Sequence, residues 1–243
     1  AQLDAEEKKR FAREVAFIYQ NARGSMNPRM RIEDILAEPI RLHRLCADSA
    51  IPERVAALLD RVGLPAGLLQ RFPSELSGGQ IRRVAIARAL AAEPQVIMAD
   101  ESVAGLDVSV QAQVLNLLRD LCRESGITLV FITHDLGVAS YLCEKIAVLY
   151  LGRIVEQGPT DAILNTPRHP YTRALLQAFP RFDMPLKASL SGEIPSPVDL
   201  PQGCRFAGRC SEAQAACRET DPALTMFDAE RQVACLFPVA SAR

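Results

Sequence analysis

Residues 76–90 read LSGGQIRRVAIARAL, and this stretch decides both the local fold and the first candidate site. Its apolar residues predict a helix over 77–92 that begins with the turn Ser77-Gly78-Gly79. Adjacent glycines let backbone N–H groups approach an anion closely, and the N-terminus of a helix adds its positive end. The stretch therefore predicts a phosphate-binding turn, although an ordinary serine-capped helix would show the same residues.

Short apolar runs alternate with helical patterns on both sides of this helix. We expect strands at 15–19, 96–99, 128–133 and 146–150, and further helices at 32–45, 52–62, 108–124 and 136–144. The alternation predicts an α/β fold with a mostly parallel sheet and, along its edge, a hairpin that turns at Leu151-Gly152. Prolines become frequent after Thr166, so we expect one domain at 1–165, with a helical subdomain at about 27–92, and a small extension at 166–243.

Three polar residues follow the predicted strands at the edge where parallel sheets bind their ligands. Asp100 and Glu101 follow the strand at 96–99, and His134 follows the strand at 128–133. Asp100 fits a Mg²⁺ ligand, and Glu101 fits a base that polarises water. The alternatives are a solvated acidic pair and a core histidine whose ring nitrogens bond to the backbone.

The composition excludes several classes of protein. The 28 basic and 29 acidic residues nearly cancel, and a pI near 6.4 argues against a protein that grips nucleic acid through its phosphates. The longest apolar runs have the length of a strand, far below the roughly 20 residues of a membrane-spanning helix. An odd total of seven cysteines favours a reducing compartment over a complete disulfide framework.

Five short motifs occur in the order seen in ABC-type ATPase domains, which the chain therefore resembles. They are Gln20 after a strand, LSGGQ at 76–80, VIMADE at 96–101, GLD at 105–107 and ITHD at 132–135. HPYTRALL at 169–176, GEIPSP at 192–197 and GCRFAGRC at 203–210 are similar to the subfamily that powers oligopeptide, dipeptide and nickel importers. The resemblance implies a P-loop NTPase-like fold, present as an incomplete ABC ATPase domain with a small C-terminal extension.

The resemblance implies roles for four residues around one nucleotide. Gln20 corresponds to the Q-loop glutamine, which senses Mg²⁺ and water and communicates with the membrane subunit. Asp100 corresponds to the aspartate associated with Mg²⁺, and Glu101 to the catalytic base. His134 corresponds to the switch histidine that contacts the γ-phosphate.

It also implies roles across the interface between two such domains. Ser77, Gly78, Gly79 and Gln80 correspond to the signature that caps the γ-phosphate of the nucleotide held by the opposite protomer. Asp107 corresponds to the aspartate of the D-loop.

The sequence contains no phosphate loop of the form G-x-x-x-x-G-K followed by Ser or Thr, whose lysine neutralises the β- and γ-phosphates. None of its four lysines, Lys8, Lys9, Lys145 and Lys187, follows a glycine. Only 19 residues precede Gln20, so we expect the chain to be the C-terminal part of a longer ATPase. Alone, it is expected to be poorly soluble or to associate, and neither to bind ATP tightly nor to hydrolyse it.

Four cysteines, Cys204, Cys210, Cys217 and Cys235, gather near the C-terminus among glycines and prolines. Four thiolates can hold zinc or an iron–sulfur cluster. The spacing lacks the short C-x₂-C pair of zinc ribbons, which weakens the case for zinc. By resemblance, some peptide-importer ATPases carry a 4Fe–4S cluster in this region. A cluster, zinc, and unligated or oxidised thiols all remain open at this point.

Together these features predict the energy-coupling ATPase of a peptide or nickel importer, with ATP and Mg²⁺ as cofactors. The expected partners are a second ATPase subunit, identical or related, transmembrane permease subunits and, indirectly, a substrate-binding protein; no nucleic acid is expected. The protein is then peripheral to the cytoplasmic face of the plasma membrane. The alternatives are a soluble ABC-like ATPase that acts on nucleic acid or ribosomes, and a non-enzymatic gene remnant.

Overall fold

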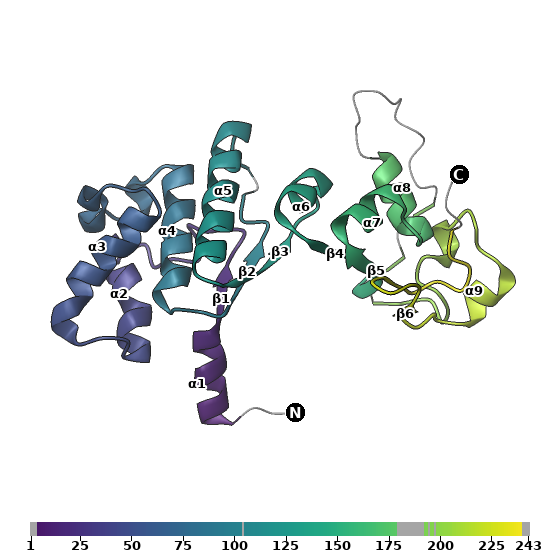
Figure 1. Ribbon diagram of the computed structural model, residues 1–243, viewed down its shortest axis with the longest axis horizontal. Coiled ribbons are helices and arrows are strands. Elements are labelled where there is room, and N and C mark those ends of the chain that lie inside the picture. Colours follow the sequence, from purple (N-terminus) through teal and green to yellow (C-terminus); the bar gives the residue numbers. More distant parts are fainter. Residues whose placement is uncertain (1–3, 104, 179–191, 194, 197, 240–243) are drawn as a thin grey trace. The chain divides into compact units, whose positions relative to one another are not determined.

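The computed structural model describes residues 4–103, 105–178, 192–193, 195–196 and 198–239. The chain divides into two compact units, Ala1–His134 and Asp135–Arg243 (Figure 1). The division predicted at residue 165 stays a prediction. Residues 179–191 of the predicted extension, and Ile194 and Pro197 of the GEIPSP motif, lie outside the described residues.

A parallel sheet forms the centre of the first unit. Its strands are β1 (Val15–Ile18), β2 (Val96–Asp100) and β3 (Thr128–Ile132), in the order β1-β2-β3. Both pairs are parallel, with Val96 opposite Val15 on one side and opposite Thr128 on the other. The carboxyl ends of the three strands therefore meet at one edge, as the motif positions predicted.

Helices pack on one face of this sheet. α4 (Gly78–Ala91) contacts β1, α5 (Val108–Glu124) contacts β3, and the two helices lie side by side (Figure 1). α2 (Ile32–His43) and α3 (Ile51–Arg61) pack on α4, which is buried along most of its length. The 3₁₀ turns η1 (Asp48–Ala50), η2 (Ala66–Gln70) and η3 (Pro73–Glu75) connect these helices.

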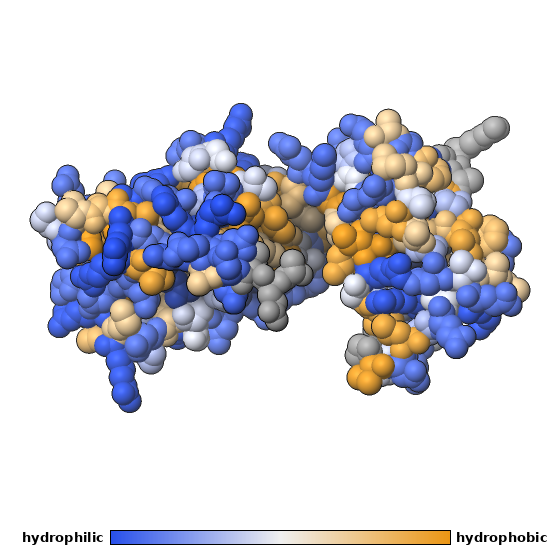
Figure 2. Space-filling model, turned by 90° about the horizontal axis from the view of Figure 1, so that it is seen from below, coloured by the Kyte–Doolittle hydropathy of each residue, from blue (hydrophilic) through white to orange (hydrophobic). Residues whose placement is uncertain are grey.

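The other face of the sheet exposes apolar side chains. Phe17 on β1 is 42% exposed, and Val130 and Ile132 on β3 are 41% and 48% exposed. On β2, by contrast, Ile97 and Ala99 are fully buried, because they point toward the helices. Figure 2 shows hydrophobic areas among hydrophilic ones on the visible face of the molecule.

The predicted strands and long helices of the first unit are confirmed to within two residues at each end. α1 (Ala5–Glu14) was not predicted, although its start carries a capping box in which Asp4 and Glu7 each accept the other's backbone N–H. None of the side chains of α1 is buried, so its charged sequence has no apolar pattern that would predict a helix.

The second unit begins with α6 (Leu136–Leu142) and the hairpin β4 (Lys145–Tyr150) and β5 (Arg153–Pro159). The predicted turn is confirmed, since Leu151 and Gly152 both have a positive φ, +45° and +74°. The predicted place of the hairpin is wrong: it belongs to a separate antiparallel sheet of order β4-β5-β7-β6, with β6 at Thr225–Met226 and β7 at Gln232–Val233. The C-terminal segment, and not the parallel sheet, supplies the partner of β5.

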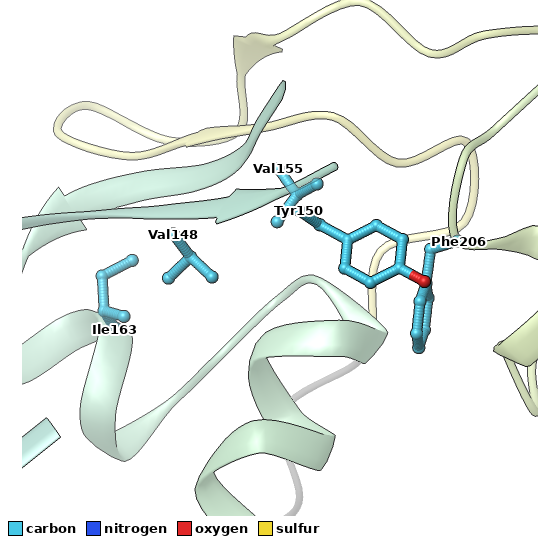
Figure 3. Close-up of a cluster of buried hydrophobic side chains, with 5 residues drawn as sticks. All are labelled: Val148, Tyr150, Val155, Ile163 and Phe206. Carbon is cyan, nitrogen blue, oxygen red and sulfur yellow. The ribbon is translucent and has the colours of Figure 1, made fainter. Parts of the chain in front are cut away.

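Short helices and an aromatic cluster complete this unit. The helices are α7 (Thr160–Asn165), α8 (Pro170–Ala178), the turn η4 (Ala207–Arg209) and α9 (Ala215–Glu219). Its core contains Val148, Tyr150, Val155, Ile163 and Phe206 (Figure 3). The rings of Tyr150 and Phe206 meet edge to face with centroids 5.3 Å apart, a favourable aromatic geometry.

A buried carboxylate fixes the start of α8. Glu156 is fully buried, and its two oxygens accept the backbone N–H groups of Arg168 at 2.7 Å and His169 at 2.9 Å. A carboxylate at a helix N-terminus satisfies donors that the helix leaves free. Among the described residues, none of the helices has the length and hydropathy to cross a bilayer.

Candidate functional site

The carboxyl end of β2 carries the acidic pair. The Asp100 side chain is exposed, and Glu101 follows it with a φ of +40°. The Glu101 N–H donates to the carbonyl of Ile132 at 2.9 Å, so β3 holds this turn in place. A positive φ is uncommon for a glutamate and is tolerated where the surroundings impose it.

Two side chains, one after β1 and one after β3, form hydrogen bonds with the Glu101 carboxylate. The Gln20 amide donates from Nε2 to Oε2 at 2.5 Å, and His134 Nδ1 lies 2.7 Å from Oε1. Because an ionised carboxylate only accepts hydrogen bonds, Nδ1 carries the proton in this pair and donates it. The structure thus brings together Gln20, Glu101 and His134, which lie far apart in the sequence and follow the carboxyl ends of three neighbouring strands.

This arrangement suits the activation of a small nucleophile. A carboxylate held on both oxygens has a fixed orientation, and the exposed His134 and Gln20 leave the site open to solvent. Asp100, the last residue of β2, adds a second, exposed carboxylate. Mg²⁺ is commonly held by one or two carboxylates together with phosphate oxygens and water, so this donor set fits Mg²⁺ bound jointly with a nucleotide.

The signature residues form the start of α4. Ser77 is its N-cap: its hydroxyl accepts the Gln80 N–H at 3.3 Å, and the Gln80 side chain accepts the Ser77 N–H at 2.9 Å. This is a capping box, so the capped-helix alternative describes the geometry correctly. Gly78 and Gly79 carry the first backbone N–H groups of the helix, and a phosphate-binding site would use these same groups.

Glycine is required at one of these positions by packing. A Cβ on Gly79 would lie 2.9 Å from Cγ1 of Val110, in the first turn of α5. Asp107 caps that helix, since its Oδ1 accepts the Val110 N–H at 3.0 Å. The starts of α4 and α5, which carry the signature and Asp107, therefore lie against each other.

The four C-terminal cysteines also come together. Cys204, Cys210, Cys217 and Cys235 line one pocket in the second unit, with His169 in its wall. Gly203 makes this possible, because a Cβ there would lie 2.5 Å from the carbonyl oxygen of Cys217, which accepts the Cys204 N–H at 2.8 Å. All seven cysteines of the chain carry free thiols.

Burial favours the neutral forms of three of these thiols and of His169. Desolvation raises the pKa of the Cys204 and Cys210 thiols, and raises that of Cys235 to about 11. His169 is 1% exposed, and burial lowers its pKa to about 4. Its Nδ1 accepts the Tyr171 N–H at 3.0 Å, so the neutral ring carries its proton on Nε2.

The thiols do not form a site for a single ion. Among the described residues, no group of three or more His, Cys, Asp or Glu side chains is placed to hold one metal ion. A Zn–S bond of about 2.3 Å requires four sulfurs within about 4 Å of one another. This arrangement gives no support to the zinc alternative.

Comparison with known proteins identifies the family. The family model for ABC transporters matches residues 1–104, and the model for the C-terminal region of oligopeptide/dipeptide transporters matches residues 155–217. Dipeptide transport ATP-binding protein DppF of Haemophilus influenzae is 43% identical over 96% of this chain and 72% of its own length. The chain belongs to the ATP-binding proteins of oligopeptide and dipeptide ABC transporters.

Other relatives agree with this ABC family. Oligopeptide transport ATP-binding protein OppF of Escherichia coli is 46% identical over 87% of this chain and 65% of its own length. A putative peptide import ATP-binding protein of Brucella melitensis is 44% identical, and the chain spans only 59% of it. The solved structure of cbiO1 from Clostridium perfringens, part of the ABC transporter complex cbiONQ, matches with a TM-score of 0.59 at 26% identity, over 67% of this chain and 63% of that one.

The sequence did not reveal every residue around the site. Three arginines, Arg23, Arg82 and Arg88, bind the segment that carries Gln20 to the signature segment. In a chain with 24 arginines, nothing in the sequence marks these three. The burial of His169 was likewise not predicted, although His-Pro at the start of a helix is a local signal for a capped N-terminus.

Proposed function

We propose that this protein is the ATP-hydrolysing subunit of an importer for peptides. The hydrogen-bonded group of Gln20, Glu101 and His134 at the carboxyl ends of three parallel strands is the observation that carries the proposal. The proposal is further supported by membership of the family and by relatives whose names state dipeptide or oligopeptide transport. These relatives favour the importer over an ATPase that acts on nucleic acid or ribosomes.

The proposed roles follow from the contacts. Glu101 accepts a proton from the attacking water, and His134 and Gln20 fix the orientation of its carboxylate. Asp100 would be a ligand of Mg²⁺ bound with the nucleotide. Mg²⁺ supplies charge that offsets the negative charge on the transferred phosphoryl group. Hydrolysis also needs a lysine at the β- and γ-phosphates, and none of the four lysines of this sequence follows a glycine. The transporter in the assays below must therefore contain an ATPase subunit that also carries this phosphate loop.

We propose that two ATPase subunits act as a pair against transmembrane permease subunits at the cytoplasmic face of the plasma membrane, with a substrate-binding protein as an indirect partner. The first N–H groups of α4, at Gly78 and Gly79, then face the nucleotide of the partner subunit, with Ser77 and Gln80 beside them and Asp107 close by. Their exposure supports this assignment, since Ser77, Gly78 and Asp107 all reach the surface of the unit.

Uptake by the assembled transporter tests the proposal. The complete transporter is reconstituted in vesicles, and accumulation of labelled di- to pentapeptides is compared with that of nickel, with and without ATP. ATP-dependent peptide uptake is expected. Uptake of nickel but not of peptides would overturn the proposed substrate, and no ATP-dependent uptake of either would overturn the proposed function.

A 4Fe–4S cluster on Cys204, Cys210, Cys217 and Cys235 is a second proposal, supported by their shared pocket. A 4Fe–4S cluster binds four cysteine thiolates, and the pocket brings four cysteines together. The raised thiol pKa values mean that binding must release protons, so assembly is favoured at higher pH.

Anaerobic purification with iron, sulfide and zinc analysis tests the cluster. We expect iron and sulfide in equal amounts, with a broad visible absorption that Cys235→Ser abolishes and Cys46→Ser, a change in the first unit, preserves. Stoichiometric zinc, or no metal at all in anaerobically purified protein, would contradict this second proposal.

A further inference from the structure

Three arginines connect two parts of the first unit that carry different site residues. One part is the Gln20 segment, defined as residues 19–25, directly after β1. The other is the signature segment, defined as residues 73–88, which contains Ser77 and most of α4. All of the contacts below lie within the first unit.

Two of the arginines project from α4 onto the Gln20 segment. Arg82 donates from Nη1 to the carbonyl of Gln20 at 2.5 Å and to that of Tyr19 at 3.4 Å. Arg88, later on the same helix, donates to the carbonyl of Ser25 at 2.7 Å and to its hydroxyl at 3.1 Å. The helix therefore holds both ends of the Gln20 segment.

The third arginine points the other way. Arg23, within the Gln20 segment, donates to the carbonyl of Pro73 at 2.7 Å and to that of Leu76 at 2.6 Å. Leu76 immediately precedes Ser77, the N-cap of α4. Contacts in both directions tie the Gln20 segment to the point where the signature begins.

The chemistry of these contacts suits a mechanical link. Each arginine donates to main-chain carbonyl oxygens, so it constrains the path of the backbone. Burial lowers the pKa of Arg82 and of Arg88, since both guanidinium groups are withdrawn from water. A partly desolvated arginine that lost its hydrogen-bond acceptors would raise the free energy of the folded unit, so these hydrogen bonds favour the state in which the two segments stay in contact.

Gln20 is the residue through which this link reaches the site. Its carbonyl is held by Arg82, and its side-chain amide is held by Glu101. A displacement of the start of α4 therefore moves the backbone of Gln20, and with it the hydrogen bond to the Glu101 carboxylate.

We propose that Arg23, Arg82 and Arg88 are positioning residues that couple the signature to Gln20, so that closure of the signature on one nucleotide adjusts Glu101 at the other. This inference rests on the proposed function, because it assigns the signature and Glu101 to different nucleotides of a paired ATPase. The link makes the hydrolytic group at one site respond to occupancy of the second site.

Hydrogen exchange on the 243-residue chain tests the link itself. The amides of Gly24 and Ser25 donate to Asn21, so their exchange reports on the order of the Gln20 segment. Arg82→Ala is expected to speed their exchange about tenfold, the factor for losing one hydrogen bond to a charged group, and Arg82→Lys to restore part of the protection. The control is Arg83→Ala. Arg83 also donates to a carbonyl, that of Val62, and to Gln113, and among the described residues neither of these hydrogen bonds reaches the Gln20 segment.

The assembled transporter tests the coupling. Arg82→Ala is expected to lower kcat and the Hill coefficient for ATP with little change in KM, and Arg83→Ala to leave all three unchanged. If Arg82→Ala and Arg83→Ala give the same exchange and the same kinetics, the inference is overturned. A wild-type transporter that hydrolyses no ATP would defeat the proposed function and the coupling with it, while the exchange measurement would still decide whether the link exists.

Discussion

Glu101 combines an unusual backbone with a fully engaged side chain. Its φ of +40° is held by the bond from its N–H to Ile132, and its two carboxylate oxygens are held by Gln20 and His134. Strain of this kind costs of the order of 1–3 kcal/mol and persists where neighbouring contacts impose it. The contacts from β3 and from the segment after β1 therefore define where this carboxylate points.

The next residue offers a test of local stability. Ser102 is 3% exposed, and among the described residues its hydroxyl has no hydrogen-bond partner. Ser102→Ala should raise the free energy of unfolding by about 1 kcal/mol, because it removes a desolvated hydroxyl. The measurement is urea unfolding followed by circular dichroism.

A second serine serves as the control. The Ser25 hydroxyl donates to the carbonyl of Ala22 at 2.8 Å and accepts from Arg88 at 3.1 Å, so Ser25→Ala should lower the same free energy. If both variants lower the free energy of unfolding equally, the Ser102 hydroxyl has a hydrogen-bond partner in solution and the prediction is wrong.

His169 predicts a dependence of stability on pH. Its pKa is about 4 in the folded protein against an ordinary value of 6.5, so between these values the unfolded chain binds more protons. The free energy of unfolding should therefore have its full value above pH 6.5 and should decrease by up to about 3 kcal/mol as the pH drops to 4. His169→Asn should flatten this slope in urea titrations, and an unchanged slope would refute the assignment.

Some of these residues were visible in the sequence and others were not. Glu101 and His134 were predicted to meet because each follows an apolar run, and parallel strands place their carboxyl ends at one edge. The bonds of Arg82 and Arg88 to backbone carbonyls leave no such trace, since arginines also occur on other helices of the first unit, such as α3 and α5. Backbone acceptors have no side-chain identity for a sequence pattern to reveal.

At the scale of elements, the contact of α4 with α5 depends on Gly79. An added methyl group would lie 2.9 Å from Val110, and relieving that overlap must shift one helix start. Gly79→Ala should lower the free energy of unfolding by about 1 kcal/mol, a cost of overpacking that the better helix propensity of alanine offsets in part. Thermal unfolding measures the change.

Gly67 in η2 provides the matched control. A Cβ there meets nothing within 4 Å, and its φ is not in the left-handed region. Gly67→Ala should leave the melting temperature unchanged or raise it slightly, because it only restricts the unfolded chain. A Gly79→Ala variant as stable as Gly67→Ala would contradict the described packing.

The elements also show where a sequence pattern loses information. The 17 residues of α5 were predicted from start to end, because a long periodic pattern and the cap at Asp107 agree. The sheet to which the β4–β5 hairpin belongs was not predicted. The strand that pairs with β5 is β7, which has only two residues and lies some 75 positions away in the sequence. A strand of two residues has no periodicity to detect.

For the whole molecule, the missing Gly-Lys motif predicts weak nucleotide binding. Without a lysine at the β- and γ-phosphates, the 243-residue chain should show no measurable ATP hydrolysis and little heat of ATP binding in calorimetry. The exposed Phe17, Val130 and Ile132 should also make it associate at high concentration. A micromolar dissociation constant, about −8 kcal/mol of binding free energy, would contradict the weak-binding prediction.

The role of Glu101 is tested most directly by the ATPase rate of a transporter in which the ATPase subunit carries Glu101→Gln together with the phosphate-loop lysine that this 243-residue sequence lacks. Glutamine keeps the shape of the side chain but cannot accept a proton from water, so hydrolysis should fall by about two to four orders of magnitude while ATP binding is retained. Glu124→Gln, at the exposed end of α5, is the control and should leave the rate unchanged. A Glu101→Gln transporter that hydrolyses ATP as fast as this control would show that Glu101 is not the base.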